Sequence, residues 1–282
     1  KNPNQWNEGN EELKHQNHGF HADKLRIVSM GAAVGSQNST VMIGKDQVYA
    51  FGGKQYGNEY TASNQVYNID FSDSKNPKVN EISRMAFPRA NLNATILPNG
   101  EVFLNGGQAY NESEFSIFTP EIYNVKNGST RTLSPGYFRR NYHSVSLLLP
   151  DGRILVSGGD VWNSEIFYPP YLFTRNWENK LVLSERPKII NLGNELRRGE
   201  FLLEIDESKP SDIDKITLIS TGATTHAQGS EPKFRSLKFK RTKNKFLVDI
   251  PLNKNELANG MYMLFAVRTN GVPSEGKIIN LN

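Results

Sequence analysis

The most informative stretch of the sequence is PNGEVFLNGG, at residues 98–107. Its turn signal, Asn99-Gly100, is followed by a short apolar strand that ends in a Gly-Gly pair. Asn-Gly is a strong hairpin signal, because both residues tolerate the positive φ that a tight turn requires. A similar pattern, PDGRILVSGG, occurs at 150–159, and a related one, GKDQVYAFGG, at 44–53. The Gly-Gly pairs are 54 and 52 residues apart, so the chain contains an internal repeat.

Each copy of the repeat extends on both sides of this pattern. An apolar strand precedes each turn: STVMI, NATIL and HSVSLLL. A strand with an aromatic residue follows each glycine pair: NQVYNI, PEIYNV and SEIFYP. Four short strands in about 50 residues, with glycines after the second, are typical of a kelch-type β-propeller blade. A β-sandwich with similar hairpins is the alternative, and the regular spacing favours the propeller.

Three blades do not close a propeller, because closure takes about four to eight. We therefore expect further blades from an upstream piece of chain or from another polypeptide. Residues 30–175 are expected to hold the three blades, and residues 176–185 are expected to be a linker. Residues 186–282 contain seven short apolar strands, a number that indicates an immunoglobulin-like β-sandwich. The predicted fold class is all-β.

The first residues have a different composition from the repeat. Residues 1–29 are expected to form an N-terminal tail or loop, since strongly apolar side chains are rare in them. His15, His18 and His21 recur every three residues in this polar segment. They favour a solvated tail over a metal site.

Composition excludes several classes of protein. The chain has 282 residues, of which 37% are hydrophobic and 22% charged, and it has no cysteine. Disulfides, zinc-thiolate sites, iron-sulfur clusters and thiol nucleophiles are therefore excluded. No run of eighteen apolar residues occurs, which argues against a membrane span. The net charge of +4 is spread along the chain, which argues against a nucleic-acid partner.

Several segments together resemble the C-terminal half of the galactose oxidase and glyoxal oxidase family of copper radical oxidases. They are RNYHS with LLLPDGRILVSGG (140–159), FTPEIY (118–123), EIFYPPYLF (165–173), RPKI (186–189), Thr225-His226 and GMYMLFAVRTNGVPS (260–274). The resemblance implies a propeller that has seven blades when whole and is capped by an all-β C-terminal domain. It also implies one copper ion, Cu(II), near the propeller axis.

The resemblance assigns copper ligands residue by residue. Tyr142 corresponds to the family's axial tyrosine, which also acts as general base, and His143 to one equatorial imidazole. His226 corresponds to the histidine that a loop of the C-terminal domain brings into the propeller channel. The remaining family ligand, a tyrosine cross-linked to cysteine that holds a radical, lies on an earlier blade. It is not in this chain, which has no cysteine.

These residue types suit the metal. Imidazole nitrogens and phenolate oxygens in a tetragonal array are good ligands for Cu(II). Tyr142 and His143 would point to opposite faces within a strand, so both reach one metal only where the strand begins. Taken without the family, the pair fits strand-edge packing as well, and His226 fits a solvated loop.

Aromatic side chains in the loops after the glycine pairs are candidates for substrate binding. Tyr56 follows the first pair, and Tyr110 and Phe115 follow the second, where the family places substrate-facing side chains. Loop aromatics stack well on sugar rings, but they also cover their own blade. Arg139 and Arg140 precede the proposed ligands and either position an anion or phenolate or form a salt-bridged blade edge.

The resemblance implies a secreted or extracellular copper-dependent oxidoreductase, of which this chain is the C-terminal part. Such an enzyme oxidises a primary alcohol or aldehyde with O2 and gives H2O2, its substrate being a small alcohol, aldehyde or carbohydrate. The alternative is a non-catalytic kelch and immunoglobulin-like module that binds a glycan or a protein, and the lack of cysteine favours it. A third hypothesis is an association module that completes its propeller with another chain.

Overall fold

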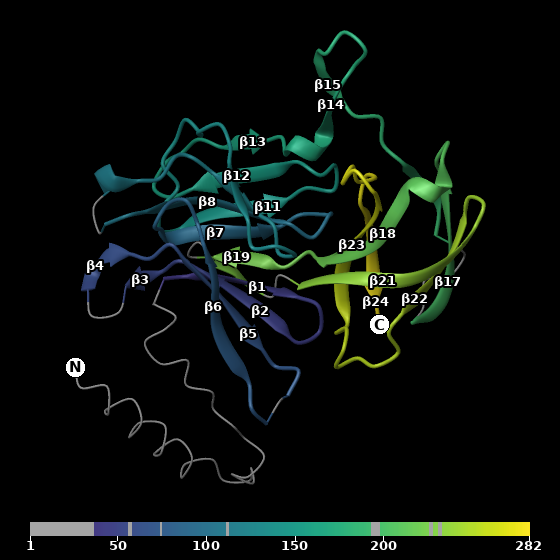
Figure 1. Cartoon of the computed structure of the whole chain (residues 1–282), viewed down its shortest axis with the longest axis horizontal. Helices are drawn as coiled ribbons and strands as arrows, with labels where there is room; N and C mark the ends of the chain where they lie inside the picture. The colour runs from purple at the N-terminus through teal and green to yellow at the C-terminus, as the bar shows by residue number, and fades with distance from the viewer. Residues whose placement is uncertain are drawn as a thin grey trace.

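The structure is a computed structural model, and it describes residues 37–55, 58–73, 75–110, 113–192, 198–225, 228–230 and 233–282. In these residues the regular structure is β-strand with short 3-10 helices, and no α-helix occurs. In the same residues no helix is long and apolar enough to cross a membrane. Figure 1 shows three stacked sheets with a second β domain at one end. The tail expected at 1–29, with its three histidines, lies outside the described residues.

Three antiparallel sheets correspond to the three copies of the repeat. Blade I contains β1 (Ser39–Ile43), β2 (Gln47–Phe51), β5 (Gln65–Asp70) and β6 (Lys78–Arg84). Blade II contains β7 (Ala90–Ile96), β8 (Val102–Gln108), β9 (Glu121–Tyr123) and β10 (Thr130–Thr132). Blade III contains β11 (Ser144–Leu148), β12 (Ile154–Gly158) and β13 (Glu165–Phe167). The loop after β2 adds a small hairpin, β3 (Lys54–Gln55) and β4 (Asn58–Ala62), and the loop after β8 a 3-10 turn, η1 (Ser113–Phe115).

The Gly-Gly pairs connect one blade to the next, which explains why they recur. The amide of Gly53 donates to the carbonyl of Arg89 over 2.7 Å, and that of Gly107 donates to the carbonyl of Arg140 over 2.7 Å. A Cβ on Gly106 would lie 2.0 Å from the Arg140 carbonyl oxygen, so only glycine permits this close approach.

Apolar side chains fill the spaces between the blades. The layer between blades I and II includes Phe51, Leu92 and Leu104, and it continues into the C-terminal domain through Phe265. A second layer lies between blades II and III and includes Phe103. One apolar layer therefore joins blades I and II to the C-terminal domain.

The C-terminal domain is a sandwich built from the seven strands predicted from the sequence. They are β16 (Lys188–Asn191), β17 (Gly199–Asp206), β18 (Ile213–Ser220), β21 (Lys233–Thr242), β22 (Lys245–Ile250), β23 (Gly260–Arg268) and β24 (Lys277–Leu281), with a 3-10 turn, η3 (Pro210–Asp212). The long strand β21 pairs with β22 in one sheet and with β18 in the other. Phe201, Leu218, Phe246 and Leu264 are among the buried side chains between the two sheets.

The sandwich docks on the hairpin turns of all three blades. In blade I, β1 pairs in parallel with β21, and the amide of Gly44 donates to the carbonyl of Phe234 over 3.1 Å. In blade II, the Thr217 hydroxyl donates to the carbonyl of Pro98 over 3.0 Å. In blade III, Arg186 Nη1 donates to the backbone carbonyl of Asp151 over 2.7 Å. We call this end of the blades the docking end.

The segment between blade III and the sandwich contains regular structure. After the 3-10 turn η2 (Pro170–Leu172), β14 (Phe173–Arg175) and β15 (Leu181–Leu183) form a hairpin that projects from the body of the molecule (Figure 1). The linker expected at 176–185 therefore contains β15 and the turn of this hairpin. The domain limits of 30–175 and 186–282 stay predictions.

Candidate functional site

Tyr142 and His143 lie in the turn immediately before β11, at the end of the blade opposite to the docking end. The amide of Ser144 closes this turn by donating to the carbonyl of Asn141 over 3.0 Å. The two rings stack, with centroids 4.0 Å apart and planes 28° apart. Both side chains are exposed. A phenol oxygen and an imidazole nitrogen are therefore presented side by side, although neighbours within a strand would point apart.

The backbone of His143 is left-handed, with φ +63°. Gln37 and Asn91 hold the matching positions of blades I and II, 106 and 52 residues before His143, and both have φ +60°. This conformation is uncommon for residues other than glycine, and asparagine tolerates it better than histidine does. A left-handed residue thus lies at or next to the start of the first strand in each blade, and only in blade III does a Tyr-His pair occupy this place.

A buried arginine precedes this turn in blades II and III. Arg89 donates to the carbonyl of Gly106 over 2.7 Å and pairs with Glu121 at 2.9 Å, and both charged side chains are fully buried. Burial lowers the pKa of Arg89, and the Glu121 carboxylate partly offsets that effect. Arg140 repeats the arrangement, with Glu165 at 3.0 Å. This ion pair supports the salt-bridge interpretation of the Arg139-Arg140 sequence.

A hairpin of the C-terminal domain runs along the first strands of the blades. It consists of β19 (Ala223–Thr225) and β20 (Gln228–Ser230), which follow β18. β19 contacts β11, and β20 contacts β7 and β1, so the hairpin lies beside all three blades (Figure 1). His226, the third ligand expected from the sequence, lies outside the described residues; in the sequence it follows β19 directly.

The aromatic residues expected to face substrate are partly described. Tyr110 and Phe115 pack edge to face, with centroids 4.8 Å apart, and both are more than two-fifths exposed. Their loop is tied to the Tyr-His turn, because Asn141 Nδ2 donates to Ser116 Oγ over 2.8 Å. The structure therefore brings this pair close to the candidate ligands. Tyr56 lies outside the described residues.

The donor set can be tested against a copper ion. Among the described residues, no three His, Asp or Glu side chains are grouped so that they could hold a metal. The family's ligand set does not require such a group, because it also uses tyrosine. A phenol and an imidazole from adjacent stacked rings, beside a hairpin that leads to a second imidazole, fit Cu(II) chemistry.

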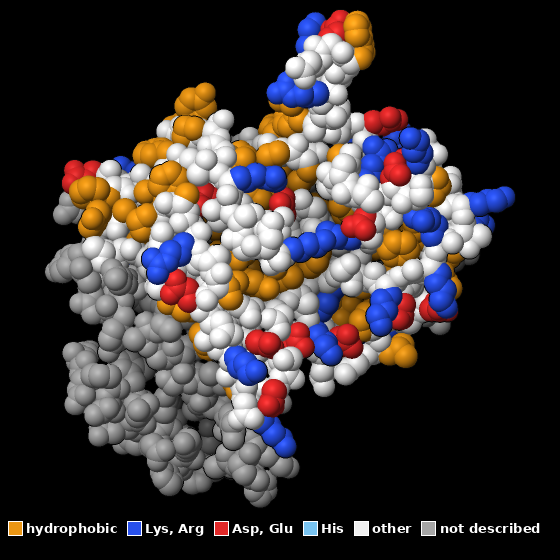
Figure 2. Space-filling model, viewed as in Figure 1, with side chains coloured by type: hydrophobic (Ala, Val, Ile, Leu, Met, Phe, Trp, Pro, Cys, Tyr) orange, Lys and Arg blue, Asp and Glu red, His pale blue; other side chains and the backbone are white. Residues whose placement is uncertain are grey.

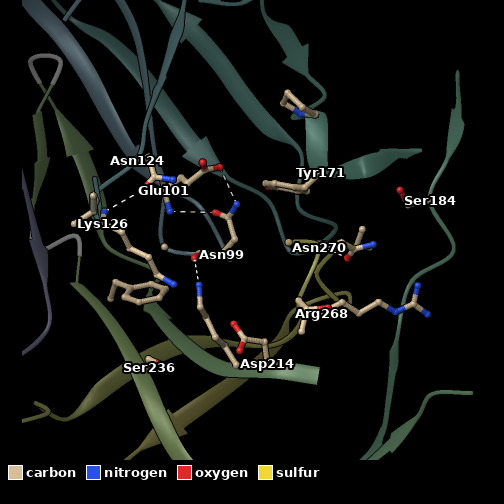
Figure 3. A pocket seen from close by; sticks show the side chains of 18 of the residues that line it. Asn99, Glu101, Asn124, Lys126, Tyr171, Ser184, Asp214, Ser236, Arg268 and Asn270 are labelled. Carbon is tan, nitrogen blue, oxygen red and sulfur yellow. Dashed lines mark hydrogen bonds between the residues drawn. The ribbon is translucent and has the colours of Figure 1, made fainter. Parts of the chain in front are cut away.

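A hollow of about 710 Å³ lies at the docking end, between the turns of blade II and the C-terminal domain (Figure 3). The polar groups that line it already bind one another: Lys215 Nζ donates to the backbone carbonyl of Asn99 over 2.8 Å, and Arg131 pairs with Glu101 at 3.0 Å. Burial lowers the pKa of Lys215, as does the nearby charge of Lys126. None of the described residues predicted to form the site lines this hollow, which we interpret as part of the domain joint.

The sequence analysis missed the arginine-glutamate pairs as a repeated feature. A phenylalanine stands two residues before each arginine, and the guanidinium lies 5.5 Å from that ring's centroid in both blades. Two sequence patterns mark the pair in each blade. Phe-x-Arg stands before the first strand, at 87–89 in blade II and 138–140 in blade III, and Glu-Ile-aromatic forms the third strand, at 121–123 and 165–167. These patterns were overlooked because buried charge is not part of the apolar pattern that marks strands.

The fold and the site define an all-β protein of propeller blades and an immunoglobulin-like sandwich, with a Tyr-His pair at one end of the blades. Residues 26–174 match the family model for the glyoxal oxidase N-terminus, and residues 186–281 match the galactose oxidase-like Early set domain. The first match covers more than half of the chain. The chain therefore belongs to the glyoxal oxidase and galactose oxidase family.

Individual relatives agree with this assignment. A galactose oxidase of Gibberella zeae is 28% identical over 253 residues, which are 84% of this chain and 36% of that protein. The aldehyde oxidase GLOX1 of Arabidopsis thaliana is 28% identical over 230 residues, 70% of this chain and 36% of that protein. This chain thus spans about a third of the length of these relatives.

A solved structure extends the likeness to three dimensions. A fungal alcohol oxidase of the AA5 family, in complex with copper, superimposes with a TM-score of 0.77 at 22% identity. The match covers 87% of this chain and 54% of that one. At this identity the likeness supports the fold.

Proposed function

We propose that this chain is the C-terminal part of a copper-dependent oxidase that oxidises a primary alcohol or aldehyde with O2 and releases H2O2. The observation that carries the proposal is the stacked Tyr142-His143 pair, at the end of the blades, beside a hairpin whose two strands flank His226 in the sequence. The copper-bound alcohol oxidase of similar fold, and relatives named as galactose and aldehyde oxidases, support it.

The roles of the residues follow from their chemistry. His143 and His226, as neutral imidazoles, and the phenol oxygen of Tyr142 would hold the copper ion. When bound, the copper supplies one-electron redox chemistry. As a phenolate, Tyr142 would accept the proton of the substrate hydroxyl as general base, since its side chain is exposed and stacks on the imidazole of His143.

The aromatic pair Tyr110-Phe115 would bind substrate. The rings expose apolar surface next to the ligand turn, and such surfaces stack on the C–H faces of small alcohols and sugars. The hydrogen bond between Asn141 and Ser116 would keep their loop in register with the ligands. Tyr56, in the equivalent loop of blade I, is proposed for the same role.

Blade III supports the proposal that further blades complete the propeller. Ser144 and Ser146 bond to blade II, so the alternating Val145 and Leu147 face away from it, and both are only partly covered. The amides of Gly53 and Gly107 each donate to a carbonyl of the next blade, whereas the amide of Gly159 has no such acceptor within the described residues. Another blade would supply the apolar contact and the acceptor.

The upstream blades would also supply the radical-bearing tyrosine and its cysteine, because this chain has no cysteine. The same absence favours the second candidate, a module that binds a glycan or protein without catalysis. The upstream sequence separates the two candidates, since only an oxidase requires a cysteine and a tyrosine there. That the protein acts outside the cell is a further prediction of the family resemblance.

The decisive assay measures peroxide formation by the protein together with its upstream chain, on a panel of primary alcohols and aldehydes. We expect activity that Tyr142→Phe abolishes while copper remains bound. Tyr137→Phe is the matched control, because Tyr137 lies in the same loop with 90% of its surface exposed, and it should keep activity. A copper-loaded protein that gives no peroxide with any substrate would favour the binding module.

A further inference from the structure

The conformation of the ligand turn requires an explanation, because His143 sits in the left-handed region at φ +63°. A histidine persists there only where the surrounding structure fixes the backbone. The rings of Tyr142 and His143 stack on each other and are both exposed. Buried contacts that can fix this backbone occur among the residues that precede the turn.

Arg140 is the residue before this turn that is fixed most firmly. Only 3% of its side chain is exposed, and its guanidinium binds two strands of its own blade. Nη1 donates to the carbonyl of Gly158 over 2.9 Å, at the end of β12, and Nη2 pairs with Glu165 at 3.0 Å, at the start of β13. The other oxygen of Glu165 accepts a bond from the amide of Tyr137 over 2.8 Å. The Arg140 carbonyl in turn accepts the bond from Gly107 of blade II.

Blade II shows what this arrangement does without ligands. Arg89 makes the same bonds to Gly106 and Glu121, and the left-handed residue that follows is Asn91. One residue separates Arg89 from Asn91, whereas two separate Arg140 from His143. Blade III therefore has one more residue than blade II between the buried arginine and the left-handed residue. The two arginines are held in the same way, so the additional residue lengthens the turn and places Tyr142 beside His143.

We propose that Arg140 is a positioning residue for the copper site. Through Glu165 and the Gly158 carbonyl, it fixes the start of the longer turn, so that the phenol of Tyr142 and the imidazole of His143 project together. The copper part of this inference rests on the proposed function. The geometric part, that Arg140 fixes the turn, does not.

The test compares Arg140→Lys with Arg89→Lys. Lysine keeps the charge but lacks the planar fork that binds a carboxylate and a carbonyl at once. The first readout needs no copper: amide hydrogen exchange at residues 142–144. We expect it to become roughly tenfold faster in Arg140→Lys and to stay unchanged in Arg89→Lys, because opening is local.

The second readout is the Cu(II) dissociation constant from EPR titration. We expect Arg140→Lys to weaken binding by about 10–100-fold, as losses of supporting residues around a metal do, and Arg89→Lys to leave it unchanged.

Each outcome decides one part of the inference. Unchanged exchange at 142–144 in Arg140→Lys overturns the proposal, and so does an equal loss of copper affinity in both variants. A wild-type protein that binds no copper defeats the proposed function, and the exchange data still decide whether Arg140 fixes the turn. If Arg140→Lys does not fold, Glu165→Gln takes its place. If Arg89→Lys does not fold, the control is Arg131→Lys, which changes the more exposed Arg131-Glu101 ion pair of blade II.

Discussion

Blades II and III are built alike, yet only one of them carries the candidate ligands. Both have a buried arginine that holds a glycine carbonyl and a glutamate, and both continue into a left-handed residue at or next to the start of the first strand. This residue is Asn91 in blade II and His143 in blade III, where one additional residue separates it from the arginine. The candidate ligand pair is thus an addition to a scaffold that the two blades share, and the scaffold and the candidate site can be perturbed separately.

The blades also differ in how far neighbours cover them. Hydrophobic side chains gather along the upper left of the molecule, over blades II and III (Figure 2). Blade II is covered on both faces by neighbours, whereas Ile166 and Trp162 of blade III are 41% and 103% exposed. Among the described residues, blade III therefore presents exposed apolar side chains as well as the turn with the candidate ligands.

The largest expected effect comes from removing one member of a buried ion pair. Glu121→Ala leaves Arg89 unpaired in a fully buried position, which should lower the free energy of unfolding by about 3–5 kcal/mol. Glu165→Ala should cost less, about 1–2 kcal/mol, because a fifth of the Glu165 side chain is exposed and water can solvate the arginine. Urea unfolding of both variants measures the difference. Equal losses would show that burial does not distinguish the two pairs.

Exchanging the left-handed residues should have an intermediate effect. His143→Asn should raise the free energy of unfolding of the copper-free protein by about 0.5–1 kcal/mol, because asparagine tolerates positive φ better. Asn91→His should lower it by a similar amount. Thermal unfolding in the presence of a chelator measures both changes. A loss of stability in His143→Asn would contradict the view that histidine at this position is retained for copper.

The smallest effect concerns the hairpin turns, where blade III has Asp151 and blade II has Asn99 at the matching position. Burial alone would raise the pKa of Asp151, but hydrogen bonds from the side chain and backbone of Arg153 bring it below its ordinary value of 3.8. The carboxylate therefore stabilises the fold above about pH 4, and this contribution is lost as pH falls through the lowered pKa.

Asp151→Asn should remove that contribution. Since the side chain is about one-third exposed, the loss at neutral pH should stay below about 1 kcal/mol. The difference from the wild type should shrink as the pH falls below 3.8 and Asp151 itself becomes protonated at its lowered pKa. Unfolding midpoints measured between pH 2 and pH 7 test this, and a difference independent of pH would refute it.

The sequence was sufficient to predict the fold because the repeat has strong local signals. The turn at Asn99-Gly100 and the glycine pairs require particular backbone angles, so their spacing reports the blade period directly. The seven strands of the sandwich followed from apolar runs between turns. The hairpin β14–β15 was not expected, because its exposed Leu181 and Leu183 do not follow the pattern of a buried strand.

The candidate site was predictable only in part. Family resemblance suggested Tyr142 and His143, but their stacking depends on a left-handed backbone that no residue preference of histidine indicates. The sequence left two interpretations of Arg140 open, positioning of an anion or phenolate and a salt bridge at the blade edge. Its partner Glu165 is 25 residues away in the sequence, so the ion pair could not be inferred. Such long-range pairs become visible only when the strands are assembled.

The most direct test of the account is the copper content and EPR spectrum of the protein with its upstream chain. We expect one Cu(II) per chain with a tetragonal signal that is lost in His143→Ala and in His226→Ala and is altered in Tyr142→Phe. Asn91→Ala, at the matching position of blade II, should leave the signal unchanged. A wild-type protein without copper, or one that retains the same signal after both histidine replacements, would contradict the assignment of this turn as the metal site.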